Sequence, residues 1–247
     1  MAVLLSDWRA ARLAALAAPD GWLNLVARIE LAPGSHLVGR EQAIALPSGP
    51  DLLGTLTLGP DGASFARPGA PPQPFVPVQD AFPQLLVDPF LLEIHTVDGR
   101  PALRVRDLTL RPTVQLRYFP EDPAWIIRAD WASFAPEAAE IKMKDGSTAA
   151  VTLTHRATFQ HKGKTVTLTP THWKSGKPMF VFRDATAGET YPACRFLIGE
   201  EIEGDKITLD FNRAFTPPCG FTDFAICPLP PPGNLLPFRI EAGELTP

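Results

Sequence analysis

The chain has 247 residues and a formal net charge of −4, with 45% hydrophobic and 20% charged residues. This balance is that of a globular protein, and a negative chain has no overall attraction to nucleic acid, so we expect neither general disorder nor nucleic-acid binding. Proline is the exception to an ordinary composition, because its 28 residues are about twice the usual share. Such a proline content favours strand edges and ordered loops over long helices.

The N-terminal segment predicts one short helix over residues 6–18. Ser6 can cap this helix, and Trp8 and Leu16 fall near one face of it. Pro19-Asp20-Gly21 ends the helical pattern.

The start of the chain and its cysteine count bear on the compartment. No positively charged stretch precedes the first apolar residues, and no run approaches the roughly 18 apolar residues of a membrane span. Three cysteines, an odd number, do not indicate a disulfide framework. We therefore expect a cytoplasmic protein that does not contact a membrane.

From residue 21 onward the hydrophobic period changes from 3.6 toward 2, and turn signals recur about every eight to twelve residues. Residues 91–107 predict a hairpin, because Asp98-Gly99 suits a two-residue turn in which both positions need positive φ. A second hairpin is predicted at residues 151–170, with its turn at Lys162-Gly163. Two further strands are expected, at residues 177–184 and 205–215.

This pattern predicts a mainly β fold, an antiparallel barrel or sandwich of hairpins in a single domain over residues 1–247. The proline-dense residues 66–83 resemble a linker, but a boundary there leaves a first part too small to carry the hairpins that follow. We interpret them as a surface loop. Residues 211–240 are rich in proline and phenylalanine, and the apolar anchors predict an ordered cover over one end of the sheet.

Cys219 and Cys227 lie in this cover, and their spacing allows a disulfide, half of a metal site or a nucleophile. A structural zinc needs four Cys or His ligands, and the histidines include no close pair. The flanking prolines indicate extended loops rather than a helix that would activate a thiol. We expect two buried thiols and no metal or cofactor, with a disulfide as the alternative in an exported protein.

The candidate site is a group of polar residues around Gly188 and on the strand that leads into the cover. Strand alternation would place Asp210 and Asn212 on one face, where burial by the cover would require polar partners. The candidate ligand-binding residues are Arg183, Asp184, Tyr191, Arg195, Asp210, Asn212 and Arg213. Arg104 and Arg106 form a second, weaker group, which we expect to face solvent.

The sequence leaves several functions open for the main group. Arginines in a concave site bind carboxylate or phosphate, so the leading hypothesis is the binding of a small anionic molecule. The alternative is a structural or interaction module in which the same residues form a closed salt-bridge network. A third possibility is a hydrolase-like enzyme that uses Asp and Tyr as acid and base.

Two blocks of the sequence resemble a known family: FRDATAGETYPACRFL and LDFNRAFTPPCGFTDFAICPLPPPGNLLPFRIEAGE. The motifs D-F-N-R-A, P-P-C, C-P-L-P-P, N-L-L and A-G-E occur in the order found in the bacterial family catalogued as domain of unknown function 1684. The resemblance runs from Trp8 to Glu244, with GWLNLVARIEL and RVRD as its early parts and most of its weight after Phe180. The chain departs from the family at YPACRFL, where Tyr-Gly-x-Gly-Arg-Tyr-Leu is more common. The resemblance implies a single-domain, largely β bacterial protein and supplies no catalytic residues.

Overall fold

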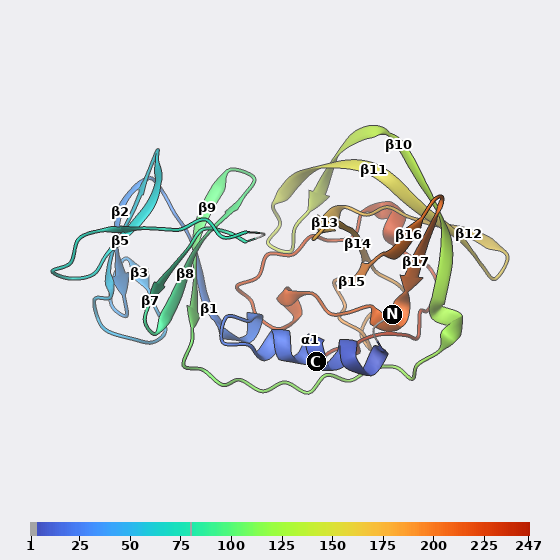
Figure 1. Cartoon of the computed structure of the whole chain (residues 1–247), viewed down its shortest axis with the longest axis horizontal. Coiled ribbons are helices and arrows are strands. Elements are labelled where there is room, and N and C mark those ends of the chain that lie inside the picture. The colour runs from blue at the N-terminus through green and yellow to red at the C-terminus, as the bar shows by residue number, and fades with distance from the viewer. Residues whose placement is uncertain (1–3, 80) are drawn as a thin grey trace. The chain divides into compact units, whose positions relative to one another are not determined.

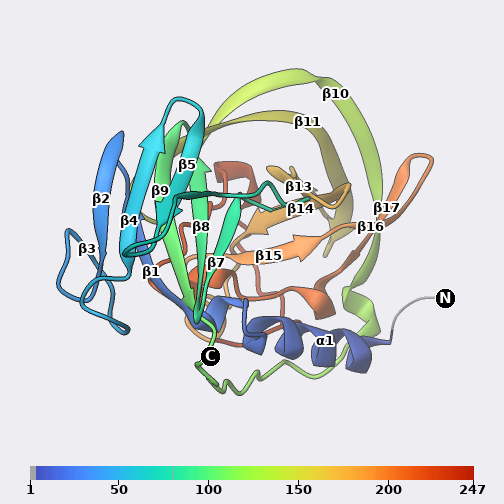
Figure 2. The same ribbon diagram turned by 60° about the vertical axis from the view of Figure 1, so that its left-hand side comes forward.

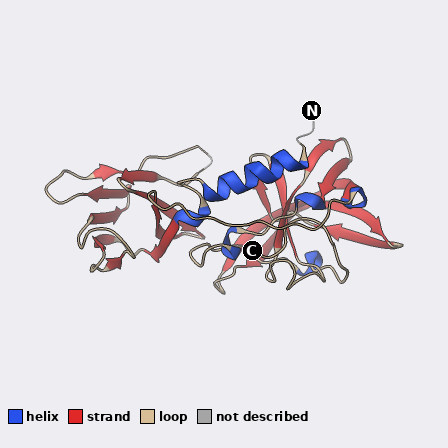
Figure 3. Ribbon diagram, turned by 90° about the horizontal axis from the view of Figure 1, so that it is seen from below, coloured by secondary structure: helices blue, strands red, loops and turns tan. Residues whose placement is uncertain are grey.

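The computed structural model describes residues 4–79 and 81–247. Strands dominate the regular structure, and α1 is the longest helix (Figure 3). The contacts of the chain group it into two compact units, Ala15–Thr113 and a second unit that joins the residues up to Ala14 to Val114–Pro247. The mainly β class is confirmed, the sheets in the described residues are open rather than closed into a barrel, and the single domain stays a prediction.

The predicted N-terminal helix is confirmed as α1 (Leu5–Ala17). Arg12 ties this helix to the C-terminal segment, because its Nε donates to the fully buried Glu244 carboxylate at 2.9 Å. Its Nη2 donates to the carbonyl of Thr216 at 2.7 Å, and the backbone N–H of Thr216 donates to Glu244 at 2.8 Å. The helix is therefore held by an ion pair that is itself satisfied by backbone groups.

The unit of residues 15–113 contains two sheets (Figure 1). The first is antiparallel, in the order β1 (Leu25–Glu30), β9 (Arg100–Asp107), β8 (Phe90–Val97), β7 (Gln84–Val87). The second has the order β3 (Ile44–Ala45), β2 (Gly34–Gly39), β4 (Gly54–Gly59), β5 (Gly62–Ala66), β6 (Gln73–Pro74), with β3 parallel to β2. A 3-10 turn, η1 (Trp22–Asn24), precedes β1. Both sheets contribute to one hydrophobic core, which includes Leu56, Phe65, Leu92 and Leu103.

Turn chemistry sets the β8–β9 hairpin as predicted. Asp98 and Gly99 have φ of 51° and 74°, which are the positive values that a tight two-residue hairpin turn requires. The proline-dense segment lies inside this unit, between β5 and β7, and contributes the short strand β6 (Gln73–Pro74).

The expectation that Arg104 and Arg106 face solvent is wrong. Leu103 and Val105 point into the core, and strand alternation places the two arginines on the opposite face. They are nevertheless only 5% and 6% exposed. Glu93 on the neighbouring strand β8 forms ion pairs with both of them, and the sequence alone does not predict this contact between strands.

The other unit has a five-stranded and a three-stranded sheet, both antiparallel in their pairings. The larger runs β12 (Lys164–Leu168), β11 (Thr148–His161), β10 (Ile126–Lys142), β17 (Lys206–Asp210), β16 (Glu200–Glu203), and a 3-10 turn, η2 (Pro123–Trp125), precedes β10. The smaller runs β13 (His172–Lys174), β14 (Lys177–Phe182), β15 (Arg195–Ile198). Strands β10 and β11 form a long curved hairpin (Figure 2), with a shift in pairing register between Ser133 and Glu137. Such irregularities bend a strand pair.

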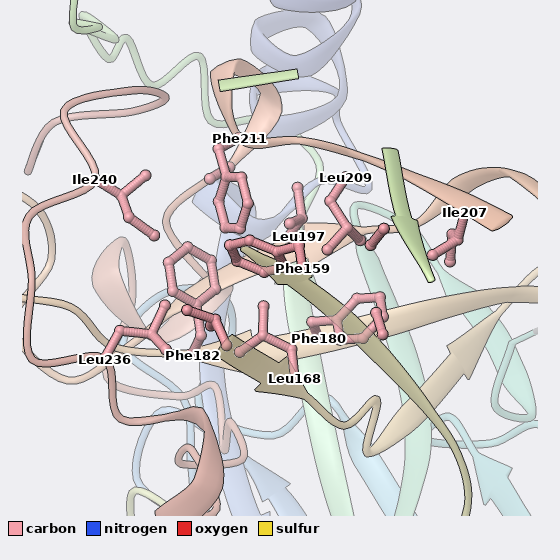
Figure 4. Close-up of a cluster of buried hydrophobic side chains, with 14 of the residues drawn as sticks. Phe159, Leu168, Phe180, Phe182, Leu197, Ile207, Leu209, Phe211, Leu236 and Ile240 are labelled. Atoms are coloured by element: carbon pink, nitrogen blue, oxygen red, sulfur yellow. The ribbon is translucent and has the colours of Figure 1, made fainter. Parts of the chain in front are cut away.

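The second predicted hairpin is confirmed as β11–β12. Lys162 and Gly163 have φ of 49° and 74°, as its tight turn requires. The core of this unit gathers side chains from both sheets and from the C-terminal segment, among them Phe159, Phe180 and Phe211 (Figure 4).

The strand predicted at residues 205–215 is shorter than expected. It ends at Asp210, because the Asp210 side chain accepts a hydrogen bond from the Asn212 backbone at 3.1 Å and starts the 3-10 turn η3 (Phe211–Arg213). Asp210 and Asn212 are therefore not on one face of a strand. They meet through this cap, in which the Asn212 Nδ2 also donates to Asp210 at 3.1 Å.

Residues 211–240 form an ordered, irregular cover with three 3-10 turns: η3, η4 (Pro218–Gly220) and η5 (Pro232–Asn234). Phe211, Leu236 and Ile240 from this segment belong to the core. The fully buried Asn234 pins it to the sheet, since its Nδ2 donates to the carbonyls of Thr169 and Val181 at 2.9 Å and 2.8 Å. Hydrogen bonds and apolar anchors together order a proline-rich chain.

We predict that Gly243→Ala destabilises this unit strongly. Gly243 has φ of +83°, and a Cβ there would lie 2.4 Å from the carbonyl oxygen of Ala214. Gly188→Ala is the matched control, because Gly188 also has positive φ, +108°, but has open space around the Cβ position. Urea denaturation should show a loss of about 1 kcal/mol for the control and a clearly larger loss for Gly243→Ala. Equal losses would contradict the close approach of the two segments.

Candidate functional site

Arg195 and Asp184 form a closed pair in the interior. Arg195, on β15, is 1% exposed, and its Nη2 donates to Asp184 Oδ1 at 2.8 Å and to the carbonyl of Ile240 at 3.1 Å. Its Nη1 donates to the carbonyl of Ala242, and its guanidinium lies 4.8 Å from the ring centroid of Phe182. Burial lowers the pKa of Arg195, and the Asp184 carboxylate opposes this effect.

The Asp184 carboxylate is satisfied on both oxygens. Oδ2 accepts the backbone N–H of Ile240 at 2.7 Å and the hydroxyl of Thr186 at 2.9 Å, while Oδ1 accepts Arg195. A carboxylate with this many donors has little capacity left to bind a ligand. The pair is bonded mainly within the protein, although the buried Arg195 Nε has no hydrogen-bond partner among the described residues.

Asp210, Asn212 and Arg213 form a second, separate group. Arg213 Nε lies 3.0 Å from Asp210 Oδ2, and its Nη1 donates to Glu200 at 3.1 Å. Asn212 exchanges hydrogen bonds with the backbone of Asp122, each of 3.0 Å. These contacts fix the end of β17 against the chain before β10. Within the part of the chain that the structure describes, no hydrogen bond joins this group to Asp184 or Arg195.

Tyr191 belongs with the thiols. Its hydroxyl donates to the carbonyl of Cys219 at 2.9 Å, and Lys144 Nζ donates to the same carbonyl at 2.9 Å. Burial raises the pKa of Tyr191, and the hydrogen bond to Cys219 raises it further. The hydroxyl is therefore a structural donor and is poorly suited to act as a base.

The cysteines are buried, as predicted, and all three are free. The sequence analysis expected Cys219 in an extended loop, but it lies in the 3-10 turn η4. Its backbone N–H donates to Cys227 Sγ at 3.3 Å. A hydrogen bond with the Cys227 thiol lowers the pKa of Cys219 to about 7, although burial acts in the opposite direction. Among residues 4–79 and 81–247, no three His, Cys, Asp or Glu side chains lie close enough to hold a metal ion.

Arg183 differs from the other predicted residues, because its side chain points outward. Phe182 and Asp184 are buried and Arg183 is exposed, which is the alternation of an extended backbone. Its backbone is held on both sides, by Asn234 at 3.1 Å and Leu236 at 2.8 Å. The guanidinium forms no hydrogen bond or ion pair with any residue that the structure describes.

Arg183 lines a cavity of about 700 Å³ within the unit that holds the C-terminal segment. Lys142 and Lys144, from the end of β10 and the turn after it, lie on the same cavity, with Glu140 as the acidic residue. The rest of the wall is mostly apolar: Ile141, Ala193, Leu229, Pro230, Pro231, Pro232 and Leu235. Backbone hydrogen bonds from Lys144 to Cys227, 2.9 Å, and from Leu229 to Lys142, 2.8 Å, hold the two sides together.

Of the seven predicted site residues, Arg183 lines this cavity and the other six do not. The two lysines were missed, because they lie about 40 positions earlier in the chain and meet Arg183 only through the fold. The available signal was the alternation Lys142-Met143-Lys144 before the turn at Asp145-Gly146. In an extended chain, this alternation places the two lysines on one face and Met143 on the opposite face.

We predict that Arg195→Met lowers the free energy of unfolding by about 3–5 kcal/mol, because it leaves Asp184 buried without its cation. The control is Arg239→Met, since Arg239 is 42% exposed and pairs with Glu189 and Glu241 at the surface. Urea denaturation should show little change for the control. Similar stability of both variants would contradict a structural role for the buried pair.

We also predict that Cys219→Ala and Cys227→Ala each lower the free energy of unfolding by about 1 kcal/mol and leave the protein folded. Each thiol is 3% exposed, so the change removes packing without exposing a charge. Calorimetry or urea denaturation measures the loss. Stoichiometric zinc in the purified protein would overturn the interpretation of these thiols as core residues.

Comparison with known proteins bears on the same unit. No protein of curated function matches the chain. An uncharacterized protein of Haloarcula marismortui, solved by NMR in solution, is 31% identical over 53% of this chain and 76% of its own, with a TM-score of 0.44. No helix in the described ranges is long and apolar enough to cross a bilayer. The family model described as "Protein of unknown function (DUF1684)" matches residues 114–245. The early segments GWLNLVARIEL and RVRD lie outside this match. Because the match covers more than half of the chain, the chain belongs to this family.

Proposed function

We propose that the protein binds a small organic anion in the cavity around Arg183. The observation that carries the proposal is an exposed guanidinium on a fixed backbone, without a partner among the described residues, at the wall of a 700 Å³ cavity. A planar guanidinium in this setting suits bidentate recognition of a carboxylate or phosphate.

The charge of the cavity supports an anion. Three cationic residues, Lys142, Lys144 and Arg183, line it with one carboxylate, Glu140. Lys144 uses one of its donors on the carbonyl of Cys219 and lies 3.9 Å from the fully exposed Asp223, so its charge is only partly screened from the cavity. The excess of positive charge attracts anions and favours their retention.

The apolar part of the wall indicates what the anionic group is attached to. Ile141, Leu229 and Leu235 contribute aliphatic surface, and three consecutive prolines, residues 230–232, add rigid rings. Fixed proline φ angles leave little backbone freedom to lose on binding, so the wall is preorganised. We therefore propose a carboxylate or phosphate on a small apolar body as the ligand.

A second candidate function is that of a structural or interaction module without a small ligand. The closed pair of Asp184 and Arg195 favours it, because these residues were expected to line a site and instead bond to the protein itself. Catalysis by Asp and Tyr has less support, because the Asp184 oxygens are occupied and the pKa of Tyr191 is raised by burial.

Arg183→Gln tests the proposal. In a thermal-shift assay with a panel of aliphatic and aromatic carboxylates and phosphate esters, the wild-type protein should be stabilised by at least one compound. A ligand at 100 times its dissociation constant contributes about 2.7 kcal/mol. Arg183→Gln should fold normally and lose most of this stabilisation, since its side chain makes no bond within the protein.

Lys162→Gln is the charge-matched control, because Lys162 lies in the exposed β11–β12 turn, outside the residues that line the cavity. It should keep the response of the wild type, and potassium chloride at equal ionic strength should not reproduce it. An anion-induced shift that survives in Arg183→Gln would contradict the proposal, and a panel without any active compound would favour the structural or interaction module.

A further inference from the structure

A second cavity lies beside the start of β10, in the unit that contains the C-terminal segment. Its volume is about 400 Å³, and it shares no lining residue with the cavity around Arg183. Two aromatic rings and one proline line it together with two carboxylates: Phe119, Pro120, Asp122, Trp125 and Glu241. None of these five residues is cationic. We call this cavity the aromatic cavity.

Backbone hydrogen bonds bring the walls of the aromatic cavity together. The N–H of Phe119 donates to the carbonyl of Gly243 at 3.0 Å, which places Phe119 beside the C-terminal wall. Asp122 caps η2, because its Oδ1 accepts a backbone N–H of this turn at 2.9 Å and its carbonyl accepts the N–H of Trp125 at 3.0 Å. The same turn therefore positions the carboxylate of Asp122 and the ring of Trp125.

Neighbouring rings hold the Trp125 side chain in place. Its ring stacks on His161 with the centroids 5.3 Å apart, and Phe211 meets it edge-on at 6.0 Å. Burial, followed by the charge of Lys162, lowers the pKa of His161, so the imidazole is neutral at physiological pH. The stack therefore fixes an indole ring at the cavity and brings no positive charge to it.

The carboxylates leave the aromatic cavity with excess negative charge. Asp122 forms no ion pair with any residue that the structure describes, and only its Oδ1 accepts a hydrogen bond from them. Glu241 pairs with Arg239 at 2.8 Å, but the same guanidinium also pairs with Glu189 at 2.8 Å. One cation outside the lining thus serves two carboxylates, and the charge of Asp122 is unpaired.

We infer that the aromatic cavity binds a small organic cation with a methylated ammonium group. Aromatic rings attract cations through their faces, and Trp does so most strongly. A methyl-covered ammonium suits a wall of rings and proline, whereas a bare ammonium keeps its water more strongly. The carboxylates add attraction for the positive charge. This ligand has the opposite charge to the one proposed for the cavity around Arg183, and the inference is independent of that proposal.

Choline and its uncharged analogue, in which carbon replaces the quaternary nitrogen, test the inference because they have the same shape and differ in charge. In a calorimetric titration, choline chloride should bind about tenfold or more tightly than the analogue. In a proton–nitrogen NMR correlation spectrum, choline should shift the indole N–H signal of Trp125, which its absence in Trp125→Leu identifies. Sodium chloride at the same ionic strength should leave this signal in place.

Two charge variants separate the carboxylates from the ring. Asp122→Asn removes one charge and keeps the turn, because Asn caps as well as Asp. Glu241→Gln removes the other charge from a side chain that is 58% exposed. Both variants should fold normally, each should weaken choline binding about threefold, and the double variant about tenfold. The matched control is Glu203→Gln, an exposed carboxylate outside the cavity, which should bind choline like the wild type.

Trp125→Leu should abolish choline binding, and the charge variants test the inference independently if loss of the ring destabilises the protein. Arg183→Gln should bind choline like the wild type, so this test and that of the proposed function can fail separately. The inference is overturned if choline does not bind or if the uncharged analogue binds as tightly. An equal shift of the Trp125 signal by sodium chloride, or unchanged affinity in Trp125→Leu or in the double carboxylate variant, would overturn it as well.

Discussion

The buried pair of Asp184 and Arg195 is the interaction on which the family-matched unit depends. It joins the loop after β14, strand β15 and the backbone of Ile240 and Ala242, of which the last two lie 45 and 47 residues after Arg195. Desolvating two charges is unfavourable, and here each charge is compensated by its partner and by backbone groups. Because Asp184 must point inward on an extended backbone, Arg183 must point outward. The same constraint that closes the interior therefore presents a free guanidinium to the cavity.

Local chemistry made part of this fold predictable. Asp98-Gly99 and Lys162-Gly163 predicted two hairpins, because few residue pairs adopt the positive φ values of a tight hairpin turn. The helical pattern of the residues after Ser6 predicted α1. Pairings between distant strands have no such signal. The burial of Arg104 depends on Glu93 being opposite it across the β8–β9 ladder, and the end of β17 depends on whether Asp210 caps the next turn. Alternation alone predicts neither.

The candidate site, too, was predictable from the sequence only in part. Composition drew attention to the segment from Arg183 to Arg213, but it could not say which polar residues would satisfy one another. Asp184 and Arg195 do so, Asp210 and Arg213 do so separately, and Arg183 does not. Lys142 and Lys144 join Arg183 only because the β10–β11 hairpin brings its turn against the proline-rich segment. The partners of each polar residue, rather than its residue type, therefore distinguish the structural residues from those of the proposed site.

The most direct test is a crystal structure of the protein with the organic anion that raises its melting temperature most. Our account predicts the anionic group within hydrogen-bonding distance of the Arg183 guanidinium, its apolar body against Leu229 and the prolines, and an unchanged Asp184–Arg195 pair. A ligand bound elsewhere in this unit while Arg183 stays free, or one that separates Asp184 from Arg195, would contradict it.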